Sequence, residues 1–90
     1  MKRAIFPGTF DPFTLGHLDI LNRSKLIFDE IIIGIGKNSD KKTMFPINKR
    51  IALIESLIDK GDNVKVMSYE GLTINFCKSV NANFIVRGVR

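Results

Sequence analysis

The strongest constraint on the fold is a nearly uninterrupted apolar run in the first half of the chain. It reads Glu30-Ile31-Ile32-Ile33-Gly34-Ile35-Gly36 and is dominated by isoleucine. β-branched residues favour strands. A strand without alternating polar residues is typical of a parallel sheet that is covered on both faces. We therefore predict a buried, parallel strand at this position.

Apolar runs and amphipathic segments alternate along the rest of the chain. Further strands are predicted at 3–6, 64–68 and 84–86, and helices at 17–28, from Pro46 onward and at 72–80. The buried sides of the first two helices are predicted to carry Ile20, Leu21, Ile27 and Phe28, and Ile47, Ile51, Ile54 and Ile58. Such alternation implies βαβ units with right-handed crossovers. The expected fold is an α/β, Rossmann-like parallel sheet in a single domain over residues 1–90.

The composition limits the kinds of partner. A hydrophobic fraction of 44% with 26% charged residues is ordinary for a soluble globular protein. The only cysteine, Cys77, excludes an intramolecular disulfide, and no apolar run approaches the ~20 residues of a membrane span. We therefore expect a soluble, cytoplasmic protein. The net charge of +5 favours anionic partners. Without a basic strand rich in aromatics or a recognition helix, small phosphorylated ligands fit better than nucleic acid.

The loop after the first predicted strand carries the clearest sign of chemistry. It reads Pro7-Gly8-Thr9-Phe10-Asp11-Pro12-Phe13-Thr14-Leu15-Gly16-His17 and leads into the first predicted helix. Backbone N–H groups at a helix start lack intrahelical partners, and the macrodipole adds about half a positive charge there. A strand, a tight loop and a helix start are therefore a place where phosphate binds. The only histidine of the chain, His17, lies where these donors point.

Each of these residues also has a plainer interpretation. Taken alone, Thr14 is a helix N-cap, His17 a capping or surface histidine, and Asp11 a turn former. Several standard motifs are missing as well. There is no G-x-x-x-x-G-K-[ST] loop, and Gly34-Ile35-Gly36 lacks the third glycine of a dinucleotide motif. Neither a Cys/His cluster with metal-ligand spacing nor a nucleophile elbow is present, so no protein metal ligands are predicted.

Taken as a whole, the first loop resembles the nucleotidylyltransferase superfamily, which carries an H/T-x-G-H signature after its first strand. Its Thr14-x-Gly16-His17 sequence follows the pattern of the phosphopantetheine adenylyltransferase family, whose first loop typically reads P-G-T-F-D-P-x-T-x-G-H. The similarity continues in the family's order at Lys41-Lys42-x-Met44-Phe45, at Arg50, and at Arg87-Gly88-Val89-Arg90.

This resemblance implies an enzyme of coenzyme A biosynthesis. Such an enzyme transfers AMP from ATP to 4′-phosphopantetheine, with Mg²⁺ on the ATP phosphates, and gives dephospho-coenzyme A and pyrophosphate. The family's sheet order is 3-2-1-4-5, and its members are commonly homohexamers. The implied catalytic residues are His17, Lys41 and Arg90. The implied ATP contacts are Thr9, Phe10, Gly16, His17, Gly88, Val89 and Arg90. The implied substrate contacts are Thr9, Lys41, Thr73 and Arg87, although Thr73 and Leu72 could equally cap and pack the third helix.

Two other interpretations stay open. The first is another member of the superfamily, such as a nicotinamide mononucleotide adenylyltransferase or a cytidylyltransferase, against which Thr14 in place of histidine argues mildly. The second is a non-catalytic basic α/β module that binds phosphorylated ligands or nucleic acid. The family's later serine-rich I-S-S-[ST] motif, which follows a fifth strand, has no match here. We therefore expect a fold cut after its fourth strand, with the 90 residues inactive on their own.

Overall fold

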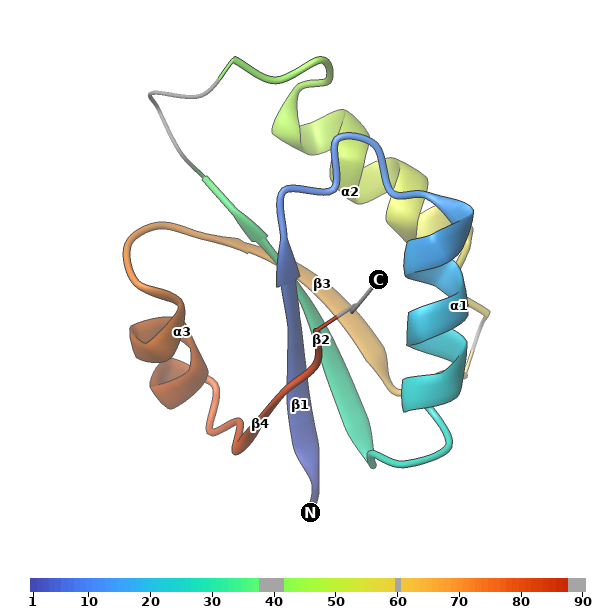
Figure 1. Ribbon diagram of the computed structural model, residues 1–90, viewed down its shortest axis with the longest axis vertical. Coiled ribbons are helices and arrows are strands. Elements are labelled where there is room, and N and C mark those ends of the chain that lie inside the picture. The colour runs from blue at the N-terminus through green and yellow to red at the C-terminus, as the bar shows by residue number, and fades with distance from the viewer. Residues whose placement is uncertain (38–41, 60, 88–90) are drawn as a thin grey trace.

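The computed structural model describes residues 1–37, 42–59 and 61–87, and within them the chain forms four strands and three helices (Figure 1). The strands are β1 (Arg3–Gly8), β2 (Glu30–Gly36), β3 (Val64–Tyr69) and β4 (Phe84–Ile85). The helices are α1 (Leu15–Ser24), α2 (Ile47–Ser56) and α3 (Thr73–Ser79). The predicted sequence of strands and helices is confirmed.

All four strands run parallel in the order β3-β2-β1-β4. This agrees with the order that the resemblance implies. The chain steps outward from β1 to β3 and then returns to the opposite side of β1. A topological switch point therefore lies between β1 and β4. In open α/β sheets, ligands bind at the carboxyl ends of the strands at such a point.

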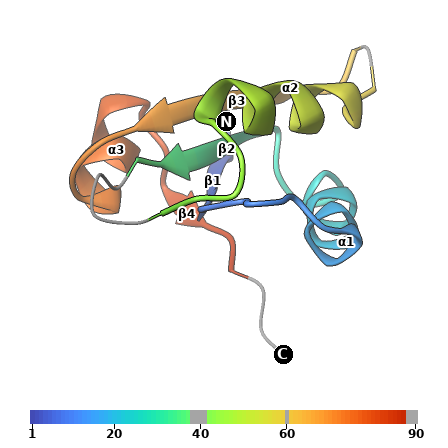
Figure 2. The same ribbon diagram turned by 90° about the horizontal axis from the view of Figure 1, so that it is seen from above.

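The helices cover the sheet on both faces, α1 and α2 on one and α3 on the other (Figures 1 and 2). Side chains of a strand alternate between faces, which divides the core in two. The larger cluster lies under α1 and α2 and contains Phe6, Phe10, Phe13, Leu21, Ile31, Ile33, Ile35 and Ile54. The smaller cluster lies under α3 and contains Ile5, Ile32, Phe76 and Cys77.

The central strand β2 is buried from Glu30 to Ile35, as its isoleucine run predicts. Its glycine has a packing role on the α3 face. A Cβ added at Gly34 would lie 2.8 Å from the Phe76 ring and 3.1 Å from the Tyr69 ring. Such contacts are too short for real side chains, so Gly34 is what lets α3 and the end of β3 approach the sheet closely.

The first helix differs from its prediction at both ends. It begins at Leu15, because Thr14 serves as its N-cap, and it ends at Ser24 instead of Phe28. Beyond Ser24 the chain closes a tighter turn, with the Leu26 N–H donating to the Arg23 carbonyl at 3.2 Å. Side chains there no longer follow the helical period. The prediction of a buried Ile27 is therefore wrong, since this side chain is 62% exposed.

The second helix keeps its predicted stripe. Ile54 is fully buried, and Ile47, Ile51 and Ile58 pack against the same cluster. Pro46 is the N-cap of α2 and not a residue of its first turn, which leaves the proline N position outside the helical hydrogen bonds as expected.

Candidate functional site

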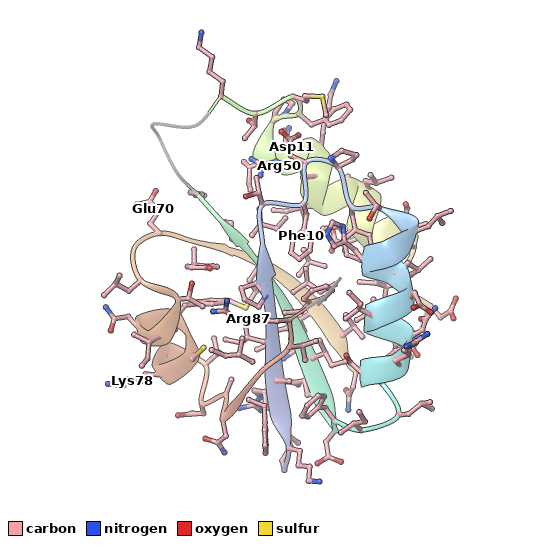
Figure 3. The ribbon with its side chains drawn as sticks, viewed as in Figure 1. Phe10, Asp11, Arg50, Glu70, Lys78 and Arg87 are labelled. Atoms are coloured by element: carbon pink, nitrogen blue, oxygen red, sulfur yellow. The ribbon has the colours of Figure 1, made fainter. Side chains whose placement is uncertain are left out.

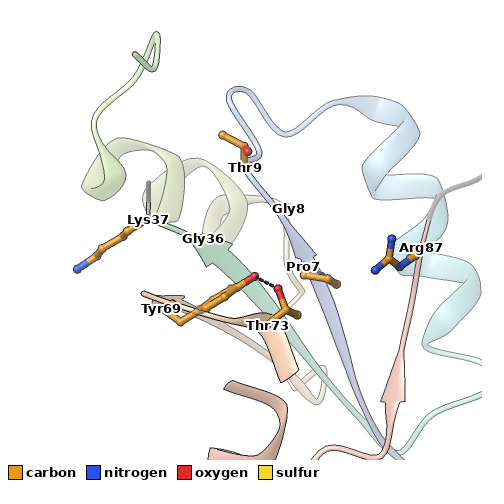
Figure 4. Close-up of a pocket in the computed structure, with 9 residues that line it drawn as sticks. Pro7, Gly8, Thr9, Gly36, Lys37, Tyr69, Thr73 and Arg87 are labelled. Atoms are coloured by element: carbon orange, nitrogen blue, oxygen red, sulfur yellow. Dashed lines mark hydrogen bonds between the residues drawn. The ribbon is translucent and has the colours of Figure 1, made fainter. Parts of the chain in front are cut away.

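Two adjoining cavities open at the carboxyl end of β1, near the switch point. The β3-side cavity, of about 520 Å³, is lined by the ends of β1, β2 and β3 and by Thr73 of α3 (Figure 4). The α1-side cavity, of about 620 Å³, lies between the end of β1 and α1, and its lining runs along the whole helix from Thr14 to Ile27 just beyond it. Pro7, Gly8 and Arg87 line both cavities. The site is therefore divided into two compartments that meet at the end of β1.

His17 lies in the first turn of α1, with its ring held from two directions. The imidazole Nδ1 accepts a hydrogen bond from the backbone N–H of Thr14 at 2.9 Å, and the backbone N–H of His17 donates to Thr14 Oγ1 at 3.3 Å. The Phe10 and Phe13 rings lie 5.0 and 5.3 Å from the imidazole centroid. Because Nδ1 accepts, the proton of a neutral imidazole is on Nε2. The capping interpretation is thus confirmed, and the cap also orients a ring that lines the α1-side cavity.

The aromatic cluster under His17 explains why β1 ends in glycine. Phe10 is 3% exposed, adopts a positive φ of 51° and contacts the Phe6 ring edge-on at 5.2 Å. A Cβ at Gly8 would lie only 2.9 Å from the Phe10 ring. That ring is fixed in the core and has little room to move. Gly8 therefore allows the loop to fold back over the end of its own strand, where it forms the shared edge of both cavities.

Two charged side chains tie the first loop to the segment that leads into α2 (Figure 3). The Asp11 carboxylate accepts hydrogen bonds from the backbone N–H groups of Met44 and Phe45 at 2.5 and 2.9 Å. In return, buried Arg50 donates to the Phe45 carbonyl at 3.1 Å and the Thr9 carbonyl at 2.8 Å. We call Asp11 and Arg50 the loop clamp. Asp11 is therefore a structural tie between two distant segments, a role that goes beyond the turn former suggested by the sequence.

The β3-side cavity is lined largely by polar groups. Thr9 lies at its β1 edge, and the Tyr69 hydroxyl pairs with Thr73 Oγ1 at 2.8 Å on the opposite wall (Figure 4). The Lys37 N–H donates to the Tyr69 carbonyl at 2.8 Å, which joins the ends of β2 and β3. The Lys37 side chain extends away from Arg87 in Figure 4. Hydroxyl groups, backbone and one guanidinium thus surround this compartment.

The structure brings the predicted site residues to the two compartments. On the α1 side lie Phe10, Gly16 and His17, on the β3 side Thr9 and Thr73, and between them Arg87. The predicted residues Lys41, Gly88, Val89 and Arg90 lie outside the residues that the structure describes. Sequence reasoning missed Lys37, Tyr69 and the structural role of the loop clamp. Lys37 directly follows β2 and Tyr69 ends β3, so the rule that ligands bind at the carboxyl ends of strands could have indicated both.

Within residues 1–37, 42–59 and 61–87, no group of three or more His, Cys, Asp or Glu side chains could hold a metal ion. No helix within them has both the length and the apolar character needed to cross a bilayer.

Comparisons with known proteins give the relationships of the chain. The family described as cytidylyltransferase-like matches residues 5–90. The chain is 56% identical over its whole length to a protein of Bacteroides thetaiotaomicron named phosphopantetheine adenylyltransferase, and 53% identical to a protein of the same name from Christiangramia forsetii. In both cases it spans 60% of the length of the relative.

Solved structures with the same fold include a lipopolysaccharide core biosynthesis protein from Thermoplasma volcanium. It is 28% identical with a TM-score of 0.73, and the match covers 94% of this chain and 72% of that one. A second is a bifunctional NMN adenylyltransferase/ADP ribose pyrophosphatase from Francisella tularensis, at 24% identity and a TM-score of 0.71, with 93% and 31% of the two chains covered. This second likeness concerns the fold alone.

Proposed function

The chain belongs to the cytidylyltransferase-like family, and we propose that it carries the substrate crevice of a phosphopantetheine adenylyltransferase. The reaction transfers AMP from ATP to 4′-phosphopantetheine and gives dephospho-coenzyme A and pyrophosphate. The choice of substrates is supported by the names of relatives that match all 90 residues at 53–56% identity. Because those relatives are longer than this chain, the complete activity is part of the proposal.

One observation in particular supports a reaction between two bound substrates. The two cavities lie on either side of the end of β1 and share Pro7, Gly8 and Arg87. We assign the nucleotide to the α1-side cavity, with its helix start and His17, and phosphopantetheine to the β3-side cavity. Their phosphates would then meet at the shared edge beside Arg87. A module that binds a single phosphorylated ligand needs no such pair of compartments.

The chemistry required at that edge is direct displacement. An oxygen of the phosphopantetheine phosphate forms a bond to the α-phosphorus of ATP, while the bond from that phosphorus to the pyrophosphate oxygen breaks and its electron pair leaves with pyrophosphate. The attacking phosphate is already ionised, so no general base is needed. Catalysis then depends on positioning and on donors for the growing negative charge.

The residues of the site fit these requirements. His17 would donate from Nε2 to an α-phosphate oxygen, since Thr14 occupies Nδ1. Thr9 and Arg87 would hold the attacking phosphate. Lys41 and Arg90, which the resemblance assigns to the phosphates, lie outside the described residues and remain part of the proposal.

Magnesium fits the site through the nucleotide and not through protein ligands. The Asp11 carboxylate already accepts two backbone hydrogen bonds. Around the shared edge, the polar side chains are the Thr9 hydroxyl, the His17 imidazole and the Arg87 guanidinium, which suit phosphate. When bound, Mg²⁺ on the ATP phosphates would neutralise their charge. A cytoplasmic location and a homohexamer follow from the resemblance and complete the proposal.

Calorimetry on the 90-residue chain tests the proposal, with ATP, CTP, 4′-phosphopantetheine and a short oligonucleotide as titrants. We expect binding of ATP and phosphopantetheine, with ATP preferred over CTP. Preference for CTP would favour a cytidylyltransferase, and binding of the oligonucleotide alone would favour a non-catalytic basic module. A pyrophosphate-release assay beside a full-length relative then measures turnover, which we expect to be negligible in the 90 residues. Light scattering during gel filtration of the full-length relative tests the assembly.

A further inference from the structure

The β3-side cavity contains a hydroxyl pair whose geometry is unusually well fixed. Tyr69 ends β3, and its ring stacks on Phe76 at a centroid distance of 4.3 Å and an interplanar angle of 4°. Gly34 and Gly36 lie close to the same ring, with a Cβ added at either falling within 3.5 Å of a Tyr69 atom. The phenol is thus held against the sheet, and its hydroxyl meets Thr73 Oγ1 at 2.8 Å (Figure 4).

Either hydroxyl can donate in this hydrogen bond, and we assign the Tyr69 hydroxyl as the donor from its acidity. A phenol is more acidic than an aliphatic alcohol, so the Tyr69 O–H is the better donor and Thr73 Oγ1 the better acceptor. The Thr73 proton is then left to donate elsewhere. A hydroxyl that accepts one hydrogen bond is a stronger donor in the next, because successive hydrogen bonds polarise one another. Both residues line the β3-side cavity, which gives this donor a place to act.

The hydroxyl of Tyr69 is not explained by packing. Phenylalanine would fill the same place on Phe76 and beside Gly34. What the phenol adds is a fixed orientation for a polar group on a ligand cavity wall. This points to recognition of a ligand group that accepts a hydrogen bond.

We propose that Tyr69 is a positioning residue for ligand recognition in the β3-side cavity. Its phenol orients the Thr73 hydroxyl so that Thr73 donates to a carbonyl oxygen of an amide-containing ligand arm. The inference rests on the proposed function, in which the cavity holds 4′-phosphopantetheine, an acyclic phosphate ester with two amide groups. It adds a specificity element that selects an amide-bearing arm over a plain alkyl phosphate.

Conservative variants separate this role from packing. In calorimetric titrations of the 90-residue chain, Tyr69→Phe should weaken binding of 4′-phosphopantetheine by about three- to tenfold, the scale of one net hydrogen bond. Thr73→Val should weaken this binding at least as much. Thr73→Ser, which keeps the hydroxyl, should bind 4′-phosphopantetheine as the parent chain does. The double variant should bind no more weakly than Thr73→Val alone, because both changes remove the same interaction. ATP affinity is the internal reference for folding and should stay within twofold.

An independent signal comes from the composition, since the chain contains one tyrosine and no tryptophan. Tyrosine fluorescence therefore reports on Tyr69 alone. We expect its emission to change in a saturable way on addition of 4′-phosphopantetheine, and to respond much less to an alkyl phosphate without amides. Equal affinities of Tyr69→Phe and the parent chain for 4′-phosphopantetheine would overturn the inference while leaving the proposed function intact. Absence of any phosphopantetheine binding by the parent chain and by a full-length relative would overturn both.

Discussion

The two walls of the crevice are built in different ways. The wall formed by the first loop is fixed by two long-range ties and one local cap. Asp11 accepts from the backbone of residues 44 and 45, Arg50 donates back to Thr9, and Thr14 and His17 cap the start of α1. The second wall, which we call the β4 wall, is the segment with Arg87 that comes directly after β4, a strand of only two residues. β4 pairs with β1 only at Ala4↔Phe84 and Ile5↔Ile85, and its side chains are exposed.

This difference separates two ways of holding a polar ligand. The first-loop wall is preorganised, so its donors lose little freedom when a ligand binds. The β4 wall depends on few backbone pairs and contributes little buried surface in the described residues. Substitutions in the first loop should therefore change both stability and binding, whereas substitutions after β4 should change binding alone.

The largest effect is expected at His17. If its Nε2 donates to the phosphate whose charge grows in the transition state, His17→Ala should lower turnover by about 10²–10³-fold, the usual scale for one such donor. KM values should change much less. The assay is pyrophosphate release by a full-length relative with the equivalent substitution. Near-normal turnover, or a defect confined to KM, would contradict the role.

The next largest effect is expected at Arg50, where a substitution should lower the stability of the fold. Arg50→Ala leaves the carbonyls of Thr9 and Phe45 without their donor and removes a buried side chain. We expect a loss of about 2–3 kcal/mol in the free energy of unfolding, measured with urea. Lys49, the exposed neighbour on the same helix, is the matched control.

Lys49→Ala should stay within about 0.5 kcal/mol of the parent chain. Arg50→Lys should fall between the two, because an ammonium lacks the planar fork that reaches both carbonyls. Equal stability of the Arg50 and Lys49 variants would show that the loop clamp contributes nothing.

The sequence predicted the order and type of every strand and helix within the described residues, because the isoleucine run of β2 and the isoleucine stripe of α2 have clear periods. It failed where the helical period stops, as at exposed Ile27, since nothing in local composition marks the tighter turn after Ser24. In the site, motif residues of the first loop could be identified from the resemblance.

The contacts that the sequence did not predict share a different cause. The resemblance names the Arg50 and Thr73 positions, but Arg50 donates to the Thr9 carbonyl, 41 positions away in the chain, and the hydrogen bond between Tyr69 and Thr73 depends on how α3 packs beside Gly34. Such relationships are set by the tertiary fold and have no local sequence pattern.

A pair of glycines sharpens the contrast within the first-loop wall. Gly8→Ala places a methyl 2.9 Å from the Phe10 ring, whereas Gly16→Ala meets Thr14 Oγ1 at 3.6 Å, an ordinary contact. Gly8→Ala should therefore cost about 1–2 kcal/mol of stability through overpacking, and Gly16→Ala much less. Gly16→Ala should instead weaken ATP binding, if backbone there approaches the nucleotide. Thermal unfolding with and without ATP distinguishes these outcomes, and equal unfolding temperatures for the two variants would contradict them.

The smallest effect on stability is expected at Arg87, and it is the sharpest test of the comparison. Arg87 is exposed and lines both cavities. Arg87→Ala should change the free energy of unfolding by less than about 0.5 kcal/mol. It should nevertheless weaken both ATP and phosphopantetheine binding in calorimetry, because a guanidinium at the shared edge faces both phosphates.

Lys78→Ala, which removes an exposed charge on α3 away from the crevice, controls for the change in net charge. If Arg87→Ala destabilised the chain as much as Arg50→Ala, the β4 wall would be as firmly built into the fold as the first loop. If it affected one ligand only, the shared edge would belong to a single compartment.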